Sequence, residues 1–424
     1  MHNLQSIRSH TLIFRQLKYK FFDLISFEQI FAPAVRSIIR LVLMTNKGQF
    51  VLYGWKLSYF TGKLSSYLKY KEIPFVEKAN NVFDLFYTVK KQTGAVVMPV
   101  LKSPDGIMMQ DTRDIMNTLE KSFPHPSVFP TSPRKRLVSD LLEVWGDEWW
   151  VPVAMHYRWN YPASVDFFMK EAGDALLPFA PRIIKNIPAR ISAKVLRSFL
   201  PIVGVRPEQH KLLERWTEKT LTLLETHFAE QPFLLGNTPS IGDFSLMGPI
   251  YAHLSRDPWP RDNLMNRFPH VMSWVDRMQK PHSTLSLKKD EDTIPDTLLP
   301  VLKCILQEFT PMATGTLSLL VKHLESDPSI ADKTLRRVIP GGDVTFPIDG
   351  SEFKRRANPF TLWKIQILVD HYRSLSNEEQ VRIMDWIEPL GGKELLLMQI
   401  PRLERQNVTV RIVNPATTMP RCYK

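Results

Sequence analysis

The sequence from residue 97 to residue 101 is Val97-Met98-Pro99-Val100-Leu101, an apolar run with a proline before its last two residues. Its β-branched residues predict a buried strand, and Pro104-Asp105-Gly106 predicts a turn shortly after it. Taken alone, Pro99 is typical of an ordinary trans proline at a strand edge. A cis peptide bond, which the motifs described below imply by their resemblance to a known family, would leave the backbone N–H and C=O of Met98 to pair with a peptide-like ligand.

The elements on both sides of this run predict a small mixed sheet. Residues 50–54 form a short apolar run typical of a buried strand, and Leu64, Tyr67 and Leu68 follow it at helical spacing. Further elements are predicted at residues 73–76 (strand), 82–92 (helix), 95–101 (strand) and 112–122 (helix). Another short strand is predicted after the turn at 104–106. A βαβ unit followed by a helix, two strands and a further helix places helices on the faces of a mixed sheet.

The rest of the chain is predicted to be mostly helical. Apolar residues recur every three or four positions between residues 134 and 278. A third block after residue 290 has helix signals at 297–309 and 360–375, and a short strand is predicted at 343–348.

The composition limits the class of protein. The chain has 424 residues, of which 44% are hydrophobic and 23% are charged, as is typical of globular proteins. Cys304 and Cys422 are too few for a disulfide framework or a cysteine-rich metal site, and no histidine and carboxylate set has metal-ligand spacing. We therefore expect no metal and a reducing compartment, and the cytoplasm is the predicted location.

The net charge of +12 is concentrated in three segments. Residues 1–45 carry six Lys and Arg against two acids, residues 182–215 carry eight against two, and residues 401–424 carry five against one. This distribution argues against a nucleic-acid partner, whose binding surface would spread the charge. The first 43 residues resemble a weak transit peptide, so a mitochondrial location is the alternative; an ordinary leading helix, or sequence upstream of a start at Met44, is the plainer interpretation.

Residues 181–200 alternate basic and apolar side chains and predict a basic amphipathic helix. Such a helix is compatible with peripheral contact at a membrane surface or with an acidic partner. A solvated face on a lid over an aromatic pocket is the plainer interpretation.

Several separated motifs resemble the glutathione transferase family. They are Leu57-Ser58-Tyr59-Phe60-Thr61-Gly62-Lys63 with Tyr70-Lys71-Glu72-Ile73-Pro74-Phe75, the run at 97–101, Gln110-Asp111-Thr112-Arg113-Asp114-Ile115, and the stretches 233–244 and 268–278. The resemblance covers roughly residues 50–281. It implies an α+β, thioredoxin-like glutathione-binding domain over 48–125 and an all-helical glutathione-transferase domain over 130–285. An N-terminal extension over 1–47 and a mostly helical C-terminal extension over 290–424 remain outside it.

The resemblance implies glutathione as a co-substrate and a set of residues that would bind it. These are Lys78, Met98, Pro99, Asp111, Thr112 and Arg113. Asp111 and Thr112 would hold the γ-glutamyl end, although the pair is also typical of a simple helix cap. Lys78 and Arg113 could pair with a carboxylate, or could be solvated charges.

The catalytic group implied by the resemblance is a hydroxyl facing the glutathione sulfur. Ser58 and Tyr59 are adjacent candidates, and Thr61 is a third. Glu72 lies fourteen positions after Ser58, and this spacing resembles that of the serine-using tau and theta-like classes. The residues Leu57-Ser58-Tyr59-Phe60, in contrast, are similar to those of the tyrosine-using classes. We expect Ser58 to be the catalytic hydroxyl. A thiol reductase would need a cysteine at the first helix, and none is present there.

The second substrate would be a small hydrophobic electrophile. Trp145, Trp149 and Tyr157 belong to an aromatic run suited to such a pocket, although aromatic residues at helical spacing also form cores. The resemblance thus predicts an enzyme of detoxification that conjugates or processes an electrophile, with a homodimer as one arrangement. The alternative is a noncatalytic binding or scaffold protein that acts through its basic segment and C-terminal extension. That extension resembles those of some bacterial members at 370–372 and 391–396.

Overall fold

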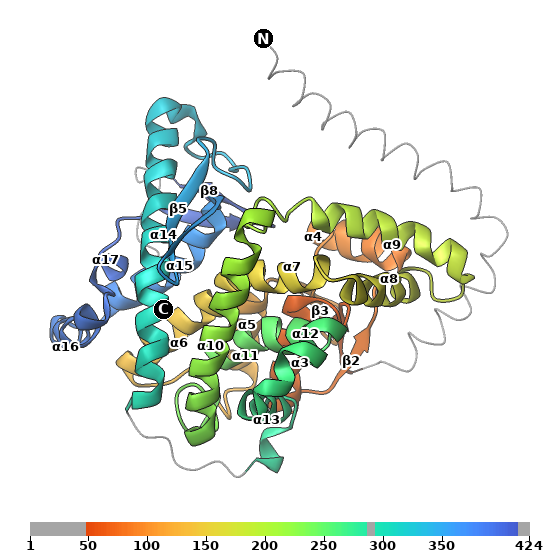
Figure 1. Cartoon of the computed structure of the whole chain (residues 1–424), viewed down its shortest axis with the longest axis horizontal. Coiled ribbons are helices and arrows are strands. Elements are labelled where there is room, and N and C mark those ends of the chain that lie inside the picture. Colours follow the sequence, from red (N-terminus) through yellow and green to blue (C-terminus); the bar gives the residue numbers. More distant parts are fainter. Residues whose placement is uncertain (1–47, 286–292, 414–424) are drawn as a thin grey trace. The chain divides into compact units, whose positions relative to one another are not determined.

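The part of the chain that the structure describes starts with a domain built on a four-stranded mixed sheet (Figure 1). This computed structural model describes residues 48–285 and 293–413, and the described residues from Phe50 onward form one compact unit. The transit-peptide prediction for residues 1–43 and Cys422 lie outside the described residues. The strands are β1 (Phe50–Tyr53), β2 (Phe75–Lys78), β3 (Val100–Lys102) and β4 (Met108–Gln110). Their order is β2-β1-β3-β4; β1 pairs parallel with β2, and the other two pairs are antiparallel.

Helices surround this sheet as the predicted thioredoxin-like fold requires. They are α3 (Tyr59–Tyr70), the π-helical segment η2 (Asp84–Val89) continued by α4 (Lys90–Thr93), and α5 (Thr112–Ser122). The Met98–Pro99 peptide bond is cis, as expected. Two predicted strands begin later than expected. The strand predicted at 73–76 is β2, displaced by two residues, and the strand predicted at 95–101 is the shorter β3.

A helical domain follows. It packs on the sheet domain chiefly through α11, which contacts α3 of the sheet domain and α6 of its own domain. Its main elements are α6 (Pro133–Val144), η3 (Trp145–Trp149), α7 (Val151–Trp159), α8 (Pro162–Leu176), α9 (Arg182–Arg197), α10 (His210–Glu230), α11 (Ile241–Pro249), η5 (Ile250–Leu254), α12 (Pro258–Asn263) and α13 (Pro269–Met278). Ser240 and Asp243, which lie three positions apart, are typical of a capping box, and this box is present at the start of α11. Asp243 also accepts hydrogen bonds from Leu234 N (2.9 Å) and Trp274 Nε1 (3.1 Å), so its structural role is confirmed.

The C-terminal extension contains long helices and two hairpins. Its elements are α14 (Leu299–Ser326), β5 (Asp343–Ile348), β6 (Ser351–Arg356), α15 (Pro359–Ser374), α16 (Asn377–Ile387), α17 (Lys393–Leu396), β7 (Leu403–Gln406) and β8 (Thr409–Ile412). Short 3₁₀ turns are η4 (Pro207–Gln209), η6 (Met265–Arg267), η7 (His282–Thr284), η8 (Asp296–Leu298), η9 (Pro328–Ile330) and η10 (Glu388–Leu390). The strand predicted at 343–348 is confirmed, whereas its partner and the β7–β8 hairpin were not predicted.

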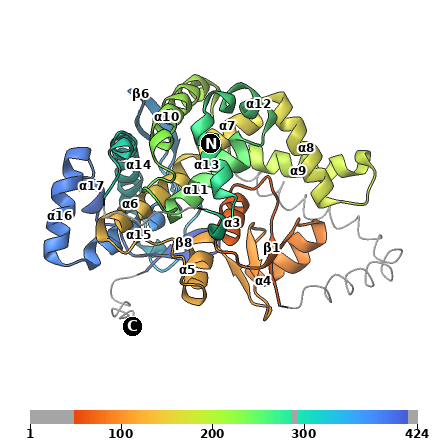
Figure 2. The ribbon, with the colours of Figure 1, turned by 90° about the horizontal axis from the view of Figure 1, so that it is seen from below.

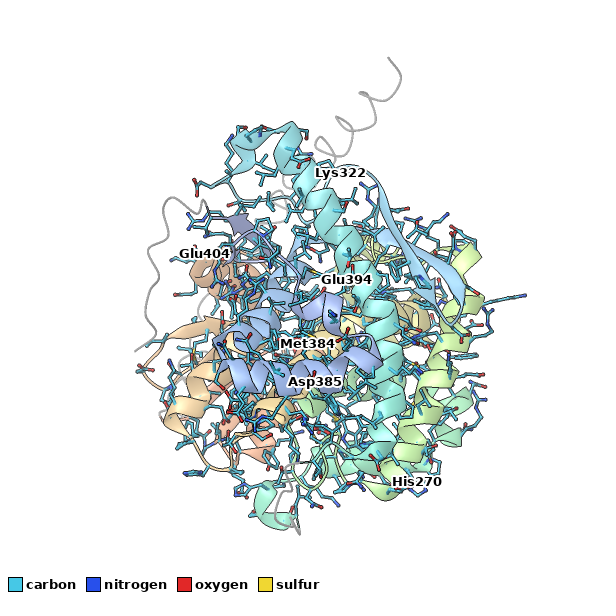
Figure 3. The ribbon with its side chains drawn as sticks, turned by 90° about the vertical axis from the view of Figure 1, so that its left-hand side faces the viewer. His270, Lys322, Met384, Asp385, Glu394 and Glu404 are labelled. Carbon is cyan, nitrogen blue, oxygen red and sulfur yellow. The ribbon has the colours of Figure 1, made fainter. Side chains whose placement is uncertain are left out.

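The extension shares a hydrophobic core with the two preceding domains. One continuous cluster of buried side chains runs from Leu52 in β1 through Trp145 to Ile412 in β8. Glu394 of α17 accepts a hydrogen bond from Thr314 Oγ1 of α14 (3.1 Å), and Figure 3 shows Glu394 beside that helix.

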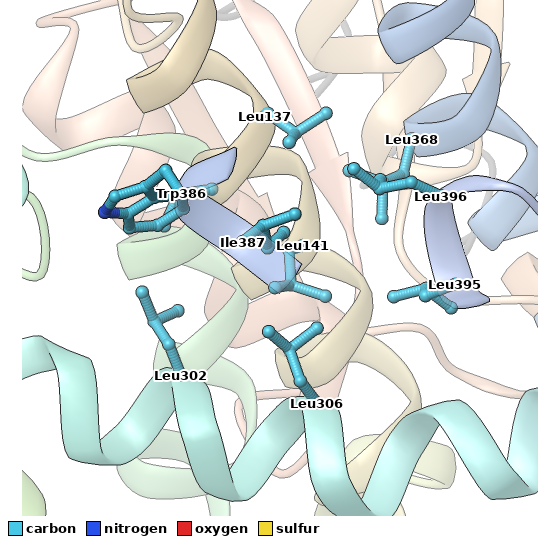
Figure 4. Close-up of a pocket in the computed structure, with 10 residues that line it drawn as sticks. Leu137, Leu141, Leu302, Leu306, Leu368, Trp386, Ile387, Leu395 and Leu396 are labelled. Atoms are coloured by element: carbon cyan, nitrogen blue, oxygen red, sulfur yellow. The ribbon is translucent and has the colours of Figure 1, made fainter. Parts of the chain in front are cut away.

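A small apolar crevice with a volume of about 10 Å³ lies where α6 meets the extension (Figure 4). It is lined by Leu137, Val138, Leu141, Leu302, Leu306, Leu368, Trp386, Ile387, Leu395 and Leu396. Its walls are side chains of the shared core.

Two negative findings apply to residues 48–285 and 293–413. None of the helices there combines the length and the apolar character that a membrane crossing would require. Within the same ranges, His, Cys, Asp and Glu side chains do not gather into a group able to hold a metal ion.

Candidate functional site

One end of the four-stranded sheet carries a row of cross-strand partners. Tyr53 of β1 pairs with Lys78 of β2 and with Val100 of β3, and Val100 in turn pairs with Gln110 of β4. These four residues therefore mark a common edge of the sheet, at which the loops that precede or follow each strand must come together.

The segments predicted to bind glutathione extend from this row. Ser58 follows β1 in the loop to α3, Met98 immediately precedes Pro99 and β3, and Asp111 directly follows β4. Met98 is half-buried against the cluster that includes Trp55. Within the described chain, no residue forms a hydrogen bond with the Met98 backbone. The fold thus brings the predicted segments together.

Ser58 and Tyr59 have opposite surroundings. Ser58 is the N-cap of α3, is partly exposed, and accepts a hydrogen bond from Thr61 N at 3.4 Å. Tyr59 is buried, and its hydroxyl donates to the backbone oxygen of Gly146. Burial, with the Asp147 carboxylate as a smaller cause, raises the pKa of Tyr59 well above its ordinary value. Of these two hydroxyls, only that of Ser58 is accessible to a ligand.

Thr61, the third candidate hydroxyl, is enclosed by protein. Its side chain is 4% exposed, and Oγ1 has no hydrogen-bond partner among the residues described. A Cβ added at Gly54 would lie 2.4 Å from Thr61 Oγ1, so this loop approaches α3 as closely as a glycine allows. Thr61 therefore has no room to meet a sulfur atom.

Asp111 and Thr112 begin α5. Asp111 has a left-handed φ of 69°, and its Oδ1 accepts hydrogen bonds from Arg113 N (3.0 Å) and Asp114 N (3.3 Å). The capping role that the sequence predicted for Asp111 is confirmed. Thr112 is 4% exposed, and its hydroxyl forms no hydrogen bond within the described residues.

The two basic candidates are placed very differently. Lys78 is 39% exposed, lies 2.6 Å from Asp84 Oδ1, and is positioned over the Tyr53 ring at 5.1 Å. The Arg113 side chain is only 4% exposed, and Nη1 pairs with Asp140 Oδ1 (2.9 Å) and with Glu143. Lys78 can reach a ligand carboxylate, whereas the Arg113 guanidinium is directed into the protein.

Arg113 belongs to a group that we call the buried charge cluster, defined as Lys63, Arg113, Asp140, Glu143, Asp147 and Lys364. Lys63 Nζ lies 2.9 Å from Glu143 Oε1 and 2.9 Å from Asp147 Oδ2. Lys364 Nζ lies 3.2 Å from the same Asp147 oxygen. The cluster joins α3, α5, α6, η3 and α15, so it links both predicted domains to the extension.

The extension also contacts the segment that begins α5. Asn407, at the turn between β7 and β8, accepts a hydrogen bond from Gln110 Nε2 at 3.0 Å. Arg405 Nη2 donates to Asp114 Oδ2 at 2.6 Å, and Lys364 Nζ lies 3.9 Å from Asp111 Oδ2. The extension therefore supports the segment predicted to hold the γ-glutamyl end of glutathione.

The aromatic residues predicted for the second-substrate pocket lie in the core. Trp145 is 1% exposed, Trp149 is 6% and Tyr157 is 2%. The Trp149 ring packs against Phe309 and Phe346 of the extension, with ring centroids 5.7 Å and 5.2 Å apart. Core packing, the alternative interpretation of this run, describes their placement, because all three side chains are buried and the extension packs against Trp149.

Sequence reasoning missed Lys364, Arg405 and Asn407. These residues lie more than 250 positions beyond the α5 segment, with separations of 297 for Asn407 and 291 for Arg405. A lysine within an otherwise apolar helix was the available signal, because such a residue must find a carboxylate when the helix is buried.

Comparisons with known proteins agree with this architecture. Residues 52–127 match the model of the glutathione S-transferase N-terminal domain, and residues 217–277 match that of the glutathione S-transferase C-terminal domain. No protein of curated function matches the chain.

Solved structures similar to the chain include three bacterial proteins. The beta-etherase LigF from Sphingobium sp. strain SYK-6 is 20% identical, with a TM-score of 0.38, over 54% of this chain and 94% of that one. FzlA from C. crescentus is 18% identical, with a TM-score of 0.36, over 60% and 92%. A glutathione S-transferase from Rhodospirillum rubrum F11 is 17% identical, with a TM-score of 0.37, over 59% and 99%. The two domain matches, in this order along the chain, support a glutathione S-transferase-like protein.

Proposed function

We propose that the protein binds glutathione at the common edge of the four-stranded sheet and conjugates it to a small hydrophobic electrophile. In this proposal the Met98 backbone pairs with the peptide backbone of glutathione. Asp111 and Thr112 hold the γ-glutamyl end, Lys78 holds a carboxylate, and the Ser58 hydroxyl faces the sulfur. The sulfur forms a bond to an electrophilic carbon, a leaving group such as halide departs with the bonding electrons, and the thiol proton goes to solvent.

The observation that carries this proposal is the position of the Ser58 hydroxyl at the N-terminus of α3. Because Ser58 Oγ accepts a hydrogen bond from Thr61 N, its own proton remains available to donate to a sulfur anion. The helix has no acidic residue in its first turn, so its positive end is not neutralised there. A hydroxyl donor and a helix N-terminus both favour the thiolate, which is the reactive form of a thiol.

The substitution Ser58→Ala tests this assignment. We expect the pKa of enzyme-bound glutathione to rise and kcat/KM with a generic aryl halide to fall on the order of a hundredfold, as when one donor to a developing anion is removed. The readouts are the ultraviolet absorbance of the bound thiolate against pH and steady-state conjugation rates. Turnover that stays unchanged between about pH 6 and about pH 8 would refute the role of Ser58.

Two variants control for the loss of a helix cap. Ser132 caps α6 with the same geometry, accepting from Lys135 N at 3.4 Å, so Ser132→Ala should lose a similar stability of about 1 kcal/mol without changing the thiol pKa. Tyr59→Phe removes the hydrogen bond to Gly146 and should likewise destabilise the fold while leaving the thiol pKa unchanged.

A noncatalytic glutathione-transferase-like binding protein is the second candidate function. It is favoured by the internal pairing of the predicted ligand charges, because Lys78 pairs with Asp84 and Arg113 pairs with Asp140. Retention on immobilised glutathione together with aryl-halide turnover supports the enzyme. Absence of both from protein with a cooperative unfolding transition supports the binding protein.

A further inference from the structure

The outer surface of α9 and of the turn before it exposes apolar and basic side chains together. Figure 1 and Figure 2 show α9 alongside α8, and its inner side carries the buried Ala189 and Ala193. These two alanines belong to a cluster with Trp159 and Phe168, so the inner side of α9 is fixed to the helical domain. The outer side carries two kinds of side chain that surfaces rarely expose together.

The first kind is apolar. Phe179, in the turn between α8 and α9, is 94% exposed, and Ile183 in the first turn of α9 is 83% exposed. Ile184 and Ile187 are 46% and 55% exposed. Exposed apolar side chains of this size are costly in water when they are contiguous in a helix turn, and they mark contact surfaces.

The second kind is basic and without an ion-pair partner. Arg190, Lys194 and Arg197 are exposed, and none forms an ion pair with another residue in the described ranges. By contrast, Arg182 and Lys185 both pair with Asp174 of α8 at 2.9 Å. The helix contains no acidic residue, so its positive charge is not neutralised along its own length.

Helical spacing places both kinds on one stripe. Ile183, Ile187, Arg190, Lys194 and Arg197 follow one another at intervals of three or four positions, and such residues share a helix face. The stripe therefore begins with apolar residues next to Phe179 and continues with three cations. We call Phe179 and this stripe, together with Ile184, the α9 face.

We propose that the α9 face docks on an anionic lipid surface. The apolar end enters the boundary between headgroups and acyl chains, while the three cations meet the negative headgroups. The α9 face has an apolar end and a basic end, and α9 contains no carboxylate that an anionic surface would repel.

Charge favours lipid over the other occupants that this chain could supply. A second copy that packed its own α9 face there would bring two sets of unpaired cations together. Residues 1–45 of the same chain carry six Lys and Arg against two acids, so their net charge is also positive. An anionic bilayer offers the complementary charge and an apolar layer at the same time.

The experiment is co-flotation of the full chain with phosphatidylcholine vesicles, with and without phosphatidylserine, at low and at high salt. We expect binding to the phosphatidylserine vesicles at low salt, weaker binding at high salt, and little binding to phosphatidylcholine alone. Arg190→Gln, Lys194→Gln and Arg197→Gln together should lower the partition coefficient about a hundredfold, because each basic residue near an anionic surface contributes about a fivefold factor.

A second variant tests the apolar end, and each variant has a matched control. Phe179→Ser with Ile183→Ser should weaken binding at both salt concentrations, because burial of these side chains is not screened. Its control is Val381→Ser with Leu397→Ser, two apolar residues that are 58% and 49% exposed elsewhere. The control for charge replaces Lys280, Lys303 and Lys322 by Gln, three exposed lysines outside the α9 face.

Three outcomes would overturn the proposal. One is that the wild-type chain does not float with phosphatidylserine vesicles at low salt. Another is that the charge control lowers binding as much as the α9 variant does, which would show a general effect of net charge. The third is binding to polyglutamate without binding to vesicles, which would identify the α9 face as a site for an acidic polypeptide.

Discussion

The buried charge cluster and the α9 face each contain three cations, and the two sets have opposite surroundings. In the cluster, Lys63 and Lys364 have carboxylate oxygens within 3.2 Å. On the α9 face, Arg190, Lys194 and Arg197 have no ion-pair partner among the described residues. The comparison shows that net charge alone does not separate cations that hold a fold together from cations that are available for a partner.

The two regions also differ in how strongly the protein holds their ionised forms. Burial alone would raise the pKa of the Glu143 carboxyl, but Arg113 and Lys63 outweigh burial and hold it well below its ordinary value. Burial alone would lower the pKa of Lys364, but Asp111 and Asp147 outweigh it and raise that pKa. The charges of the cluster therefore depend on one another, and removal of one leaves the buried cluster with an uncompensated charge.

The largest effect is expected from Lys63→Met. This change leaves Glu143 and Asp147 facing each other without the ammonium group between them. We expect the free energy of unfolding to fall by about 3–5 kcal/mol, the usual effect of breaking a buried ion pair from one side. Urea unfolding followed by far-ultraviolet circular dichroism measures it.

The matched control for Lys63→Met is a surface pair. Lys393 Nζ lies 2.7 Å from Glu388 Oε1, and the two side chains are 53% and 49% exposed. Lys393→Met should change the free energy of unfolding by no more than about 1 kcal/mol. Equal losses in the two variants would contradict the distinction between buried and exposed cations.

The second effect is a loss of stability in acid. Because the folded-state pKa of Glu143 lies below its value in the unfolded chain, the stabilisation is complete above the unfolded value of about 4.3 and is lost as pH falls further. The urea midpoint should therefore change little from neutral pH to about pH 5 and then fall steeply. Glu143→Gln should be less stable at neutral pH and should show a shallower acid limb; an unchanged acid limb in that variant would contradict the role of Glu143.

Much of the fold was predictable because its signals are local. The cap at Asp111 and the box of Ser240 and Asp243 each follow from a few adjacent residues, and the structure contains both of them. The cis bond at Pro99 is also present, but it was expected only from the resemblance of the separated motifs. The predicted helix at 112–122 is α5 to the residue. The starts of two strands were predicted too early. The apolar residues before Phe75 and Val100 have the pattern of a strand, although they lie in loops.

The surroundings of the candidate site were less predictable, because they depend on contacts between distant elements. Tyr59 follows Ser58 directly, but the next position along the helix faces the protein interior. There the Tyr59 ring packs closely against Gly248, which has no side chain to block it. Arg113 looked like a solvated or ligand-binding charge because Asp140 and Glu143 belong to a different domain. The sequence pattern of the basic helix was correctly located, but only the structure separates its paired cations from those of the α9 face.

The smallest effect is expected from the α9 face itself. Arg190→Gln, Lys194→Gln and Arg197→Gln together remove as many cations as the buried cluster contains, yet they break no ion pair among the described residues. We expect the free energy of unfolding to stay within about 0.5 kcal/mol of the wild-type value, because substitutions at exposed, unpaired positions leave no buried group without a partner. Urea unfolding in the absence of vesicles measures this, with Lys63→Met run beside it. A loss of several kcal/mol would show that these cations stabilise the fold, and the contrast between the two regions would then fail. A near-zero change combined with reduced vesicle binding would show that the three cations of the α9 face serve binding, whereas the three cations of the buried charge cluster serve folding.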